Sequence, residues 1–157
     1  MIVFWLKMQI FTDGGCSGNP GIGGWAYLIV EPDSSETIIK EAWGAEEHTT
    51  NNRMELQAVI SALEVVPTLG SSRVLEVFTD SQYVQKGMSQ WLKDWKARGW
   101  KTAAKAPVKN KDLWQRLDAL ATDFTITWHW VKGHAGNVYN ERCDSLTQKA
   151  ISSLEKH

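Results

Sequence analysis

The chain has 157 residues, of which 43% are hydrophobic and 22% are charged, so we expect one globular domain over residues 1–157. Its formal net charge of -1 gives no overall bias toward a strongly basic or acidic protein. The longest apolar stretches are too short and too interrupted to cross a bilayer, and the first residues lack the order of a signal peptide.

Alternating apolar residues predict three strands at the start of the chain, at about residues 3–13, 22–31 and 36–44. The segment between the first two, residues 14–21, is rich in glycine and is predicted to be a turn. Short connections favour an antiparallel meander for the three strands.

The apolar period then changes to that of a helix at about residues 51–66, capped by Thr49 or Thr50 and stopped by Pro67 and Gly70. The other predicted elements follow in chain order: a strand at 73–79, a short helix from Ser81 that Gly87 breaks, a helical piece carrying Trp91 and Trp95, an exposed loop at 98–107, a helix at 111–121, a strand at 124–131, a loop at 132–136 and a last helix at 138–154.

These elements predict an α/β fold with a mixed five-stranded sheet, an antiparallel meander plus two parallel strands, flanked by helices. A right-handed crossover through the helix at 51–66 would lay strand 73–79 beside the first strand and parallel to it. Asp13 and Asp80 would then lie at the same end of neighbouring strands, where open α/β sheets place their sites. Glu55 lies on the apolar stripe of the intervening helix and would lean over them.

Four acidic residues stand where a soluble domain would not ordinarily place them: Asp13, Glu55, Asp80 and Asp144. A carboxylate near a core costs on the order of several kcal/mol unless it is paired or bound to a metal. A divalent cation would remove the repulsion among four such groups, so we interpret them as a metal site. Each acid alone could instead be a surface or capping carboxylate.

Charge is distributed unevenly along the chain. Residues 31–47 contain six acids and one base, whereas residues 86–111 contain eight bases and one acid. The field at the contact surface decides binding, so the basic segment points to an anionic polymer as a partner. A solvated lysine face over a tryptophan packing cluster is the alternative interpretation.

The two cysteines, Cys16 and Cys143, give neither a disulfide framework nor a zinc spacing. We therefore expect two free thiols in a reducing compartment and a cytoplasmic location.

Distinct motifs are spread over nearly the whole chain, from about residue 8 to 150. They are Thr12–Cys16 with Gly18–Gly21, Thr49–Leu56, Thr79–Val84, Trp114–Leu117, Val131–Gly136 and Asn140–Asp144. Together and in this order they resemble the bacterial type 1 ribonuclease H family. The resemblance implies a ribonuclease H-like fold and an endoribonuclease that hydrolyses the RNA strand of RNA–DNA hybrids. Its products would carry 5′-phosphate and 3′-hydroxyl ends.

The resemblance also implies two Mg²⁺ ions per active site, with Mn²⁺ able to substitute, held by Asp13, Glu55, Asp80 and Asp144. One ion would generate the attacking hydroxide, and the other would stabilise the departing 3′ oxygen. His134 would shuttle a proton or help to release product, although a lone loop histidine is usually just solvated.

Substrate contacts carried over by resemblance fall into three groups. They are a minor-groove set (Gly14, Cys16, Asn19, Asn51, Asn52 and Gln82), a pocket for a DNA phosphate (Thr50 and Asn110) and a basic protrusion (Trp91, Trp95, Lys96, Arg98, Trp100 and Lys101). From composition alone, Asn51 and Asn52 could instead merely cap the helix.

The phosphate pocket departs from the family pattern at one position. Relatives often carry an arginine two residues before the Thr50 position, where this chain has His48 preceded by two glutamates. We therefore expect a grip on the DNA phosphate that is weaker or more dependent on pH.

The RNA–DNA hybrid is the one partner we expect, with no membrane, no obligate protein partner and a monomeric state. The alternatives are a non-catalytic hybrid-binding module of the same fold, a nuclease or integrase acting on DNA, and a fragment of a larger polymerase. The complete acidic set and the Asn51–Asn52 pair favour the hybrid-specific nuclease.

Overall fold

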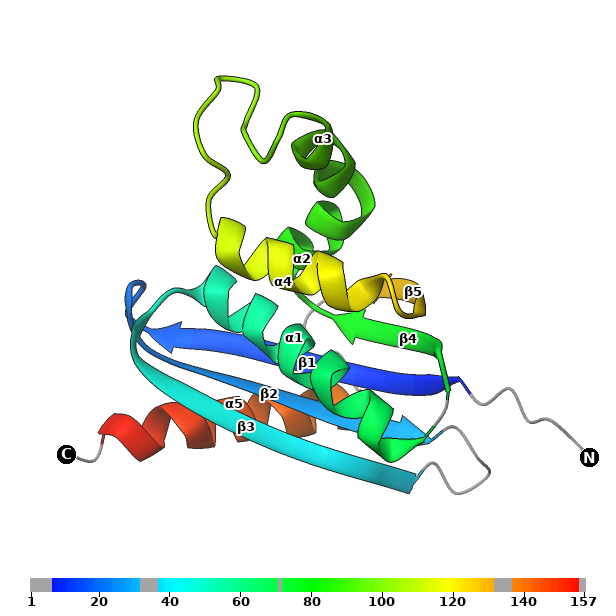
Figure 1. Ribbon diagram of the computed structural model, residues 1–157. Coiled ribbons are helices and arrows are strands. Elements are labelled where there is room, and N and C mark those ends of the chain that lie inside the picture. Colours follow the sequence, from blue (N-terminus) through cyan, green and yellow to red (C-terminus); the bar gives the residue numbers. More distant parts are fainter. Residues whose placement is uncertain (1–6, 32–36, 71, 132–136, 156–157) are drawn as a thin grey trace, which may run out of the picture.

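The computed structural model describes residues 7–31, 37–70, 72–131 and 137–155, which form a sheet with helices on both faces (Figure 1). The strands are β1 (Met8–Ser17), β2 (Gly21–Glu31), β3 (Thr37–Thr49), β4 (Val74–Thr79) and β5 (Thr125–Trp130). The helices are α1 (Asn51–Leu69), α2 (Gln82–Lys86), the π-helical turn η1 (Gly87–Trp91), α3 (Leu92–Ala97), α4 (Lys111–Ala121) and α5 (Val138–Glu155).

The five strands are arranged in the order β3-β2-β1-β4-β5. The pairs β1–β2 and β2–β3 are antiparallel, whereas β1–β4 and β4–β5 are parallel. The predicted mixed sheet is therefore confirmed, including the place of β4 beside β1. Helices α1 and α4 cover one face of the sheet and α5 covers the other (Figure 1).

Two apolar clusters hold these layers together. The larger joins Ile10 of β1 and Val77 of β4 to the buried face of α1 and to Trp114 of α4. The smaller joins Phe11 of β1 to Cys143 and Leu146 of α5. Successive strand residues point to opposite faces, so Asp13 shares with Phe11 the face that α5 covers.

The turn predicted at residues 14–21 is wrong over its first part. β1 continues through Gly14, Gly15 and Cys16, which pair with Trp25, Gly24 and Gly23 of β2. The turn shrinks to residues 18–20. Glycine tolerates unusual backbone angles but does not require them, so a glycine-rich segment can stay in a ladder.

The third strand is also longer than predicted. Residues 45–49 look polar, yet β3 runs to Thr49 and pairs with β2 as far as Gly21. An edge strand with exposed side chains needs no apolar alternation to be held by backbone hydrogen bonds. The helix after it begins as predicted, because the Thr50 hydroxyl accepts a hydrogen bond from the Arg53 N–H at 3.3 Å.

One predicted helix break is wrong. Pro67 lies inside α1, in its last turn, where the missing N–H costs a single ladder bond. The break predicted at Gly87 is confirmed, because α2 ends at Lys86 and the π-helical turn η1 separates it from α3. A Cβ at Gly87 would overlap the ring of the buried Trp114, so this glycine serves close packing.

None of the described helices is long and apolar enough to cross a membrane.

Candidate active site

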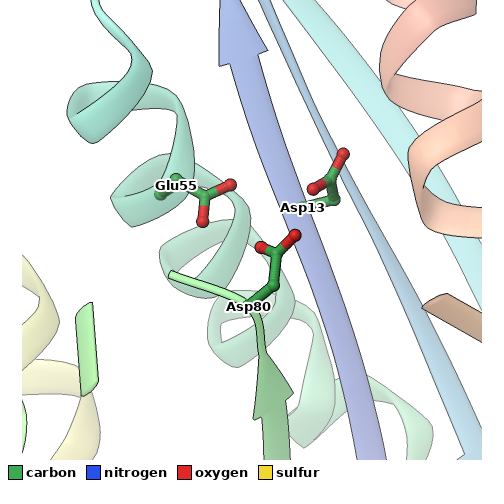
Figure 2. Close-up of side chains that lie close together, drawn as sticks. All are labelled: Asp13, Glu55 and Asp80. Carbon is green, nitrogen blue, oxygen red and sulfur yellow. The ribbon is translucent and has the colours of Figure 1, made fainter. Parts of the chain in front are cut away.

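Three of the four predicted acids converge where β4 ends beside β1. Asp13 lies on β1, Glu55 on α1 and Asp80 directly after β4, and their side chains point toward one another (Figure 2). One carboxylate oxygen from each lies within 4.8 Å of those of the other two. We call these three residues the acidic cluster. The predicted pairing of β1 with β4 brings Asp13 and Asp80 together, although Asp13 lies inside β1, which continues to Ser17, and not at its end.

Glu55 is one of the two buried members of the acidic cluster, together with Asp13. Burial raises the pKa of its carboxyl well above the ordinary value, and the nearby Asp13 and Asp80 raise it further. The Gly14 backbone and the Ser81 side chain lower this pKa but do not outweigh the burial. Among the described residues, the Glu55 Oε1 atom is buried without a hydrogen-bond partner. If Glu55 is ionised, its buried negative charge is therefore only partly compensated by the protein groups around it.

Gly14 makes the close approach of β1 to α1 possible. A Cβ built on Gly14 would lie 2.5 Å from the Met54 carbonyl carbon and 2.6 Å from the Glu55 nitrogen. Any side chain here would push α1, and Glu55 with it, away from Asp13. Gly14 therefore has a part in building the acidic cluster, and the substrate contact predicted for it stays a prediction.

Asp144 comes from α5 and is half-buried. Among the described residues, its carboxylate is not one of the three whose oxygens lie within 4.8 Å of one another. Its neighbour Cys143 anchors this part of α5 to β1, because the thiol donates to the Phe11 carbonyl oxygen at 3.3 Å. Phe11 precedes Asp13 by two residues on the same face, so α5 carries Asp144 toward the side of the sheet where Asp13 lies.

A pocket of about 280 Å³ lies beside the N-terminus of α1. The residues that line it are Asn19, Pro20, Thr50, Asn51, Asn52, Lys109 and Asn110. Five of these seven are residues that the sequence pointed to as substrate contacts. The Asn51 N–H donates to the Asn19 side chain at 3.1 Å, so β1–β2 and α1 are tied together at this pocket.

Hydrogen bonds fix the amide of Asn110 in one orientation. Its Oδ1 accepts from Arg53 at 3.3 Å, and its Nδ2 donates to the Tyr83 hydroxyl at 3.0 Å. The same hydroxyl accepts from the Trp114 indole at 2.9 Å. Asn110 has a φ of 61°, a left-handed conformation that asparagine tolerates better than most residues.

The basic protrusion stands away from the sheet, above α4 (Figure 1). Trp91, Trp95 and Trp100 form a chain of contacting rings that continues to Trp114, and each of the three is half-buried. Their packing role is thus evident, while contact with a substrate stays a prediction. Lys96, Arg98 and Lys101 are exposed, as are Gln82, Asn51 and Asn52.

Comparison with known proteins supports the family that the sequence motifs resemble, over almost the whole chain. The family model described as RNase H matches residues 6–152. The chain belongs to the ribonuclease H family. The ribonuclease H of Aromatoleum aromaticum is 56% identical over 150 residues, which cover 96% of this chain and 94% of that relative.

Solved ribonucleases H share the fold. LC9-RNase H1, a type 1 RNase H with the type 2 active-site motif, superposes with a TM-score of 0.83 at 32% identity, covering 98% of this chain and 75% of that chain. LC11-RNase H1, solved in complex with an RNA/DNA hybrid, superposes with a TM-score of 0.74 at 25% identity and covers 96% and 100%. The chain is therefore a hydrolase of the bacterial type 1 class, and its family and fold support cleavage of the RNA strand of hybrids.

The residues of the acidic cluster fit the divalent metal on which ribonucleases H depend. All three offer carboxylate oxygens, the ligands that hard divalent cations prefer. The unpartnered Glu55 Oε1 and the raised pKa of Glu55 both describe a site that lacks positive charge. A bound cation would supply that charge.

His134 lies outside the described residues, so its predicted role stays a prediction. The structure adds residues that the sequence did not single out. Ser81 lies beside Glu55 and lowers its pKa, Lys109 lines the pocket, and Arg53 and Tyr83 hold Asn110. Ser81 follows Asp80 directly and Lys109 precedes Asn110, so adjacency to a site residue was the available signal for these two.

Proposed function

We propose that this ribonuclease H is an endonuclease that cuts the RNA strand of RNA–DNA hybrids with two Mg²⁺ ions and leaves 5′-phosphate and 3′-hydroxyl ends. The observation that carries the proposal is the acidic cluster, whose three carboxylate oxygens lie within 4.8 Å of one another. Mn²⁺ would substitute for Mg²⁺, since both accept oxygen ligands. Asp144 completes the ligand set from α5.

When bound, the two cations would activate water and stabilise the charge that develops on the departing 3′ oxygen. The chain's own residues hold the geometry. Gly14 lets α1 approach β1 closely and so places Glu55, and the parallel pairing of β1 with β4 sets Asp13 against Asp80. His134 would move a proton at the reacting phosphate or help to release product.

The substrate would lie across the N-terminus of α1. Asn51, Asn52 and Gln82 are exposed and can both donate and accept hydrogen bonds to 2′-hydroxyl groups in the minor groove. Cys16, Asn19 and the Gly14 backbone border the same region. LC11-RNase H1 in its complex with an RNA/DNA hybrid supports this class of substrate for the present chain.

A DNA phosphate would occupy the pocket that Thr50 and Asn110 line. The neighbouring cation that the pocket offers is Lys109, because the guanidinium of Arg53 is engaged by Asp112 and Asn110. The exposed bases of the protrusion, with Trp91, Trp95 and Trp100 beneath them, would contact the DNA backbone beyond the pocket.

We expect the protein to act as a monomer made of one domain in the cytoplasm. The free thiols of Cys16 and Cys143 support a reducing compartment.

Endonuclease activity is tested by offering labelled RNA–DNA hybrid, double-stranded RNA and double-stranded DNA, with Mg²⁺ or with a chelator. Cleavage of the hybrid alone, dependent on Mg²⁺ and abolished by Asp13→Asn, is the expected result, and end-group analysis of the products checks the 5′-phosphate. Binding without cleavage would instead favour the non-catalytic module. Normal cleavage by Asp13→Asn would overturn the site assignment.

A further inference from the structure

Trp130, the last residue of β5, contacts the main chain of Asp80. Its indole Nε1–H donates a hydrogen bond to the Asp80 carbonyl oxygen at 3.1 Å. Trp130 pairs with Thr79 in the parallel ladder, and the Val131 N–H donates to the Thr79 carbonyl oxygen at 2.9 Å. β5 therefore stays paired with β4 as far as Thr79, the residue that precedes Asp80.

Burial does not explain the place of Trp130. Its relative exposure is 42%, whereas Trp128, two residues earlier on the same strand, packs against the larger apolar cluster. The buried part of the ring stabilises the protein but does not by itself fix the orientation of the indole, so its hydrogen bond is the informative contact.

Asp80 lies just past the end of β4, where the ladder no longer fixes the backbone. On its C-terminal side, the Ser81 N–H donates to Thr79 Oγ1 at 3.0 Å, and Ser81 Oγ accepts from the Val84 N–H at 3.1 Å. Trp130 holds the intervening carbonyl group from the side of β5. The main chain around Asp80 is thus held on both sides, which restricts how its side chain can be oriented. The Asp80 carboxylate faces Asp13 and Glu55 (Figure 2).

We propose that Trp130 is a positioning residue that orients Asp80 for binding of the divalent cation, an inference that rests on the proposed role of Asp80 as a metal ligand. Removing a group that orients a metal ligand typically lowers metal affinity about 10- to 100-fold. The indole contacts the ligand's backbone and not its carboxylate, so we expect an effect of about tenfold.

Trp130→Phe tests the proposal because it keeps a ring and removes the donor. The matched control is Trp43→Phe, which changes an exposed tryptophan (38%) on β3 that packs under Lys149. The protein without substrate is titrated with Mg²⁺ while amide chemical shifts are followed by NMR, and hybrid cleavage is measured against Mg²⁺ concentration.

The expected result is an Mg²⁺ midpoint about tenfold higher in Trp130→Phe, with cleavage recovering at high Mg²⁺, and no change in Trp43→Phe. Trp130→Met, which also lacks the donor, should give the same shift. A lower melting temperature with an unchanged Mg²⁺ midpoint would mean a merely structural role and would overturn the proposal. Failure of the wild-type protein to cut hybrids would contradict the proposed function instead, and the titration without substrate would still decide the role of Trp130.

Discussion

Arg53 of α1 and Asp112 of α4 form a two-point ion pair, with Nη1–Oδ1 and Nη2–Oδ2 distances of 3.0 and 2.8 Å. Arg53 Nη1 also donates to the side chain of Asn110. The pair therefore does more than join two helices, because it holds one wall of the pocket proposed for a DNA phosphate. Only a planar guanidinium can make this fork, so lysine is not an equivalent replacement.

Arg53→Lys should weaken hybrid binding by about two- to tenfold, the equivalent of one ordinary hydrogen bond, with little change in kcat. The effect should appear in KM, since Asn110 is proposed to contact substrate and is not part of the acidic cluster. Arg116→Lys is the control, because Arg116 pairs with Glu64 away from the pocket. Equal effects of the two substitutions on KM would contradict the role given to Arg53.

The raised pKa of Glu55 makes the stability of the metal-free protein depend on pH. The folded state holds this proton more tightly than the unfolded chain, whose glutamates titrate at about pH 4.3. The resulting contribution to stability is complete below that pH and is lost as pH rises toward the folded-state pKa. Denaturant unfolding in a chelator should therefore show a free energy of unfolding that falls from pH 5 to pH 8.

Glu55→Gln isolates this effect, because glutamine keeps the shape of the side chain and cannot ionise. Its free energy of unfolding should be nearly level over the same pH range. Saturating Mg²⁺ should reverse the trend for the wild type, since metal binding requires ionised carboxylates. If the free energies of unfolding of the wild type and Glu55→Gln change with pH in the same way in chelator, Glu55 does not bind its proton more tightly in the folded state.

The features of this protein that could be predicted from its sequence are those set by patterns along the chain, whereas most contacts between distant segments could not be predicted. The antiparallel meander, the place of β4 beside β1 and the meeting of Asp13, Glu55 and Asp80 followed from apolar periodicity and a right-handed crossover. The length of β1 did not, because whether a glycine turns or stays in a ladder is decided by what approaches it, here the backbone at Met54 and Glu55. The contact of Trp130 with Asp80 depends on the β4–β5 register, which no local pattern specifies.

Lys96 is paired within the protein and should contribute less to hybrid binding than its place in the basic protrusion suggests. Its ammonium lies 3.2 Å from Asp118 Oδ2 on α4. Asp118→Asn should release Lys96 toward phosphate, tighten hybrid binding at low salt and steepen the slope of log affinity against log salt by about one. Asp123→Asn, just beyond the end of α4, removes the same charge as a control. If both variants bind alike, the ion pair does not restrain Lys96.

Gly87→Ala should destabilise the protein by about 1–3 kcal/mol, because the added methyl group must displace the buried ring of Trp114. Gly15→Ala is the matched control, since a Cβ there meets nothing within 4 Å. Urea unfolding monitored by circular dichroism gives both values. A loss for Gly15→Ala as large as that for Gly87→Ala would show that helix or strand propensity, and not packing, sets the cost.

Mg²⁺ binding to the acidic cluster is tested most directly by following backbone amide shifts while the substrate-free protein is titrated with Mg²⁺. Saturable shifts should appear at Gly14, Glu55 and Ser81, the residues that contain or contact the cluster, and Asp13→Asn should abolish them. Unchanged amides at these positions in the wild type, or the same titration in Asp13→Asn, would contradict the metal site on which the proposed chemistry depends.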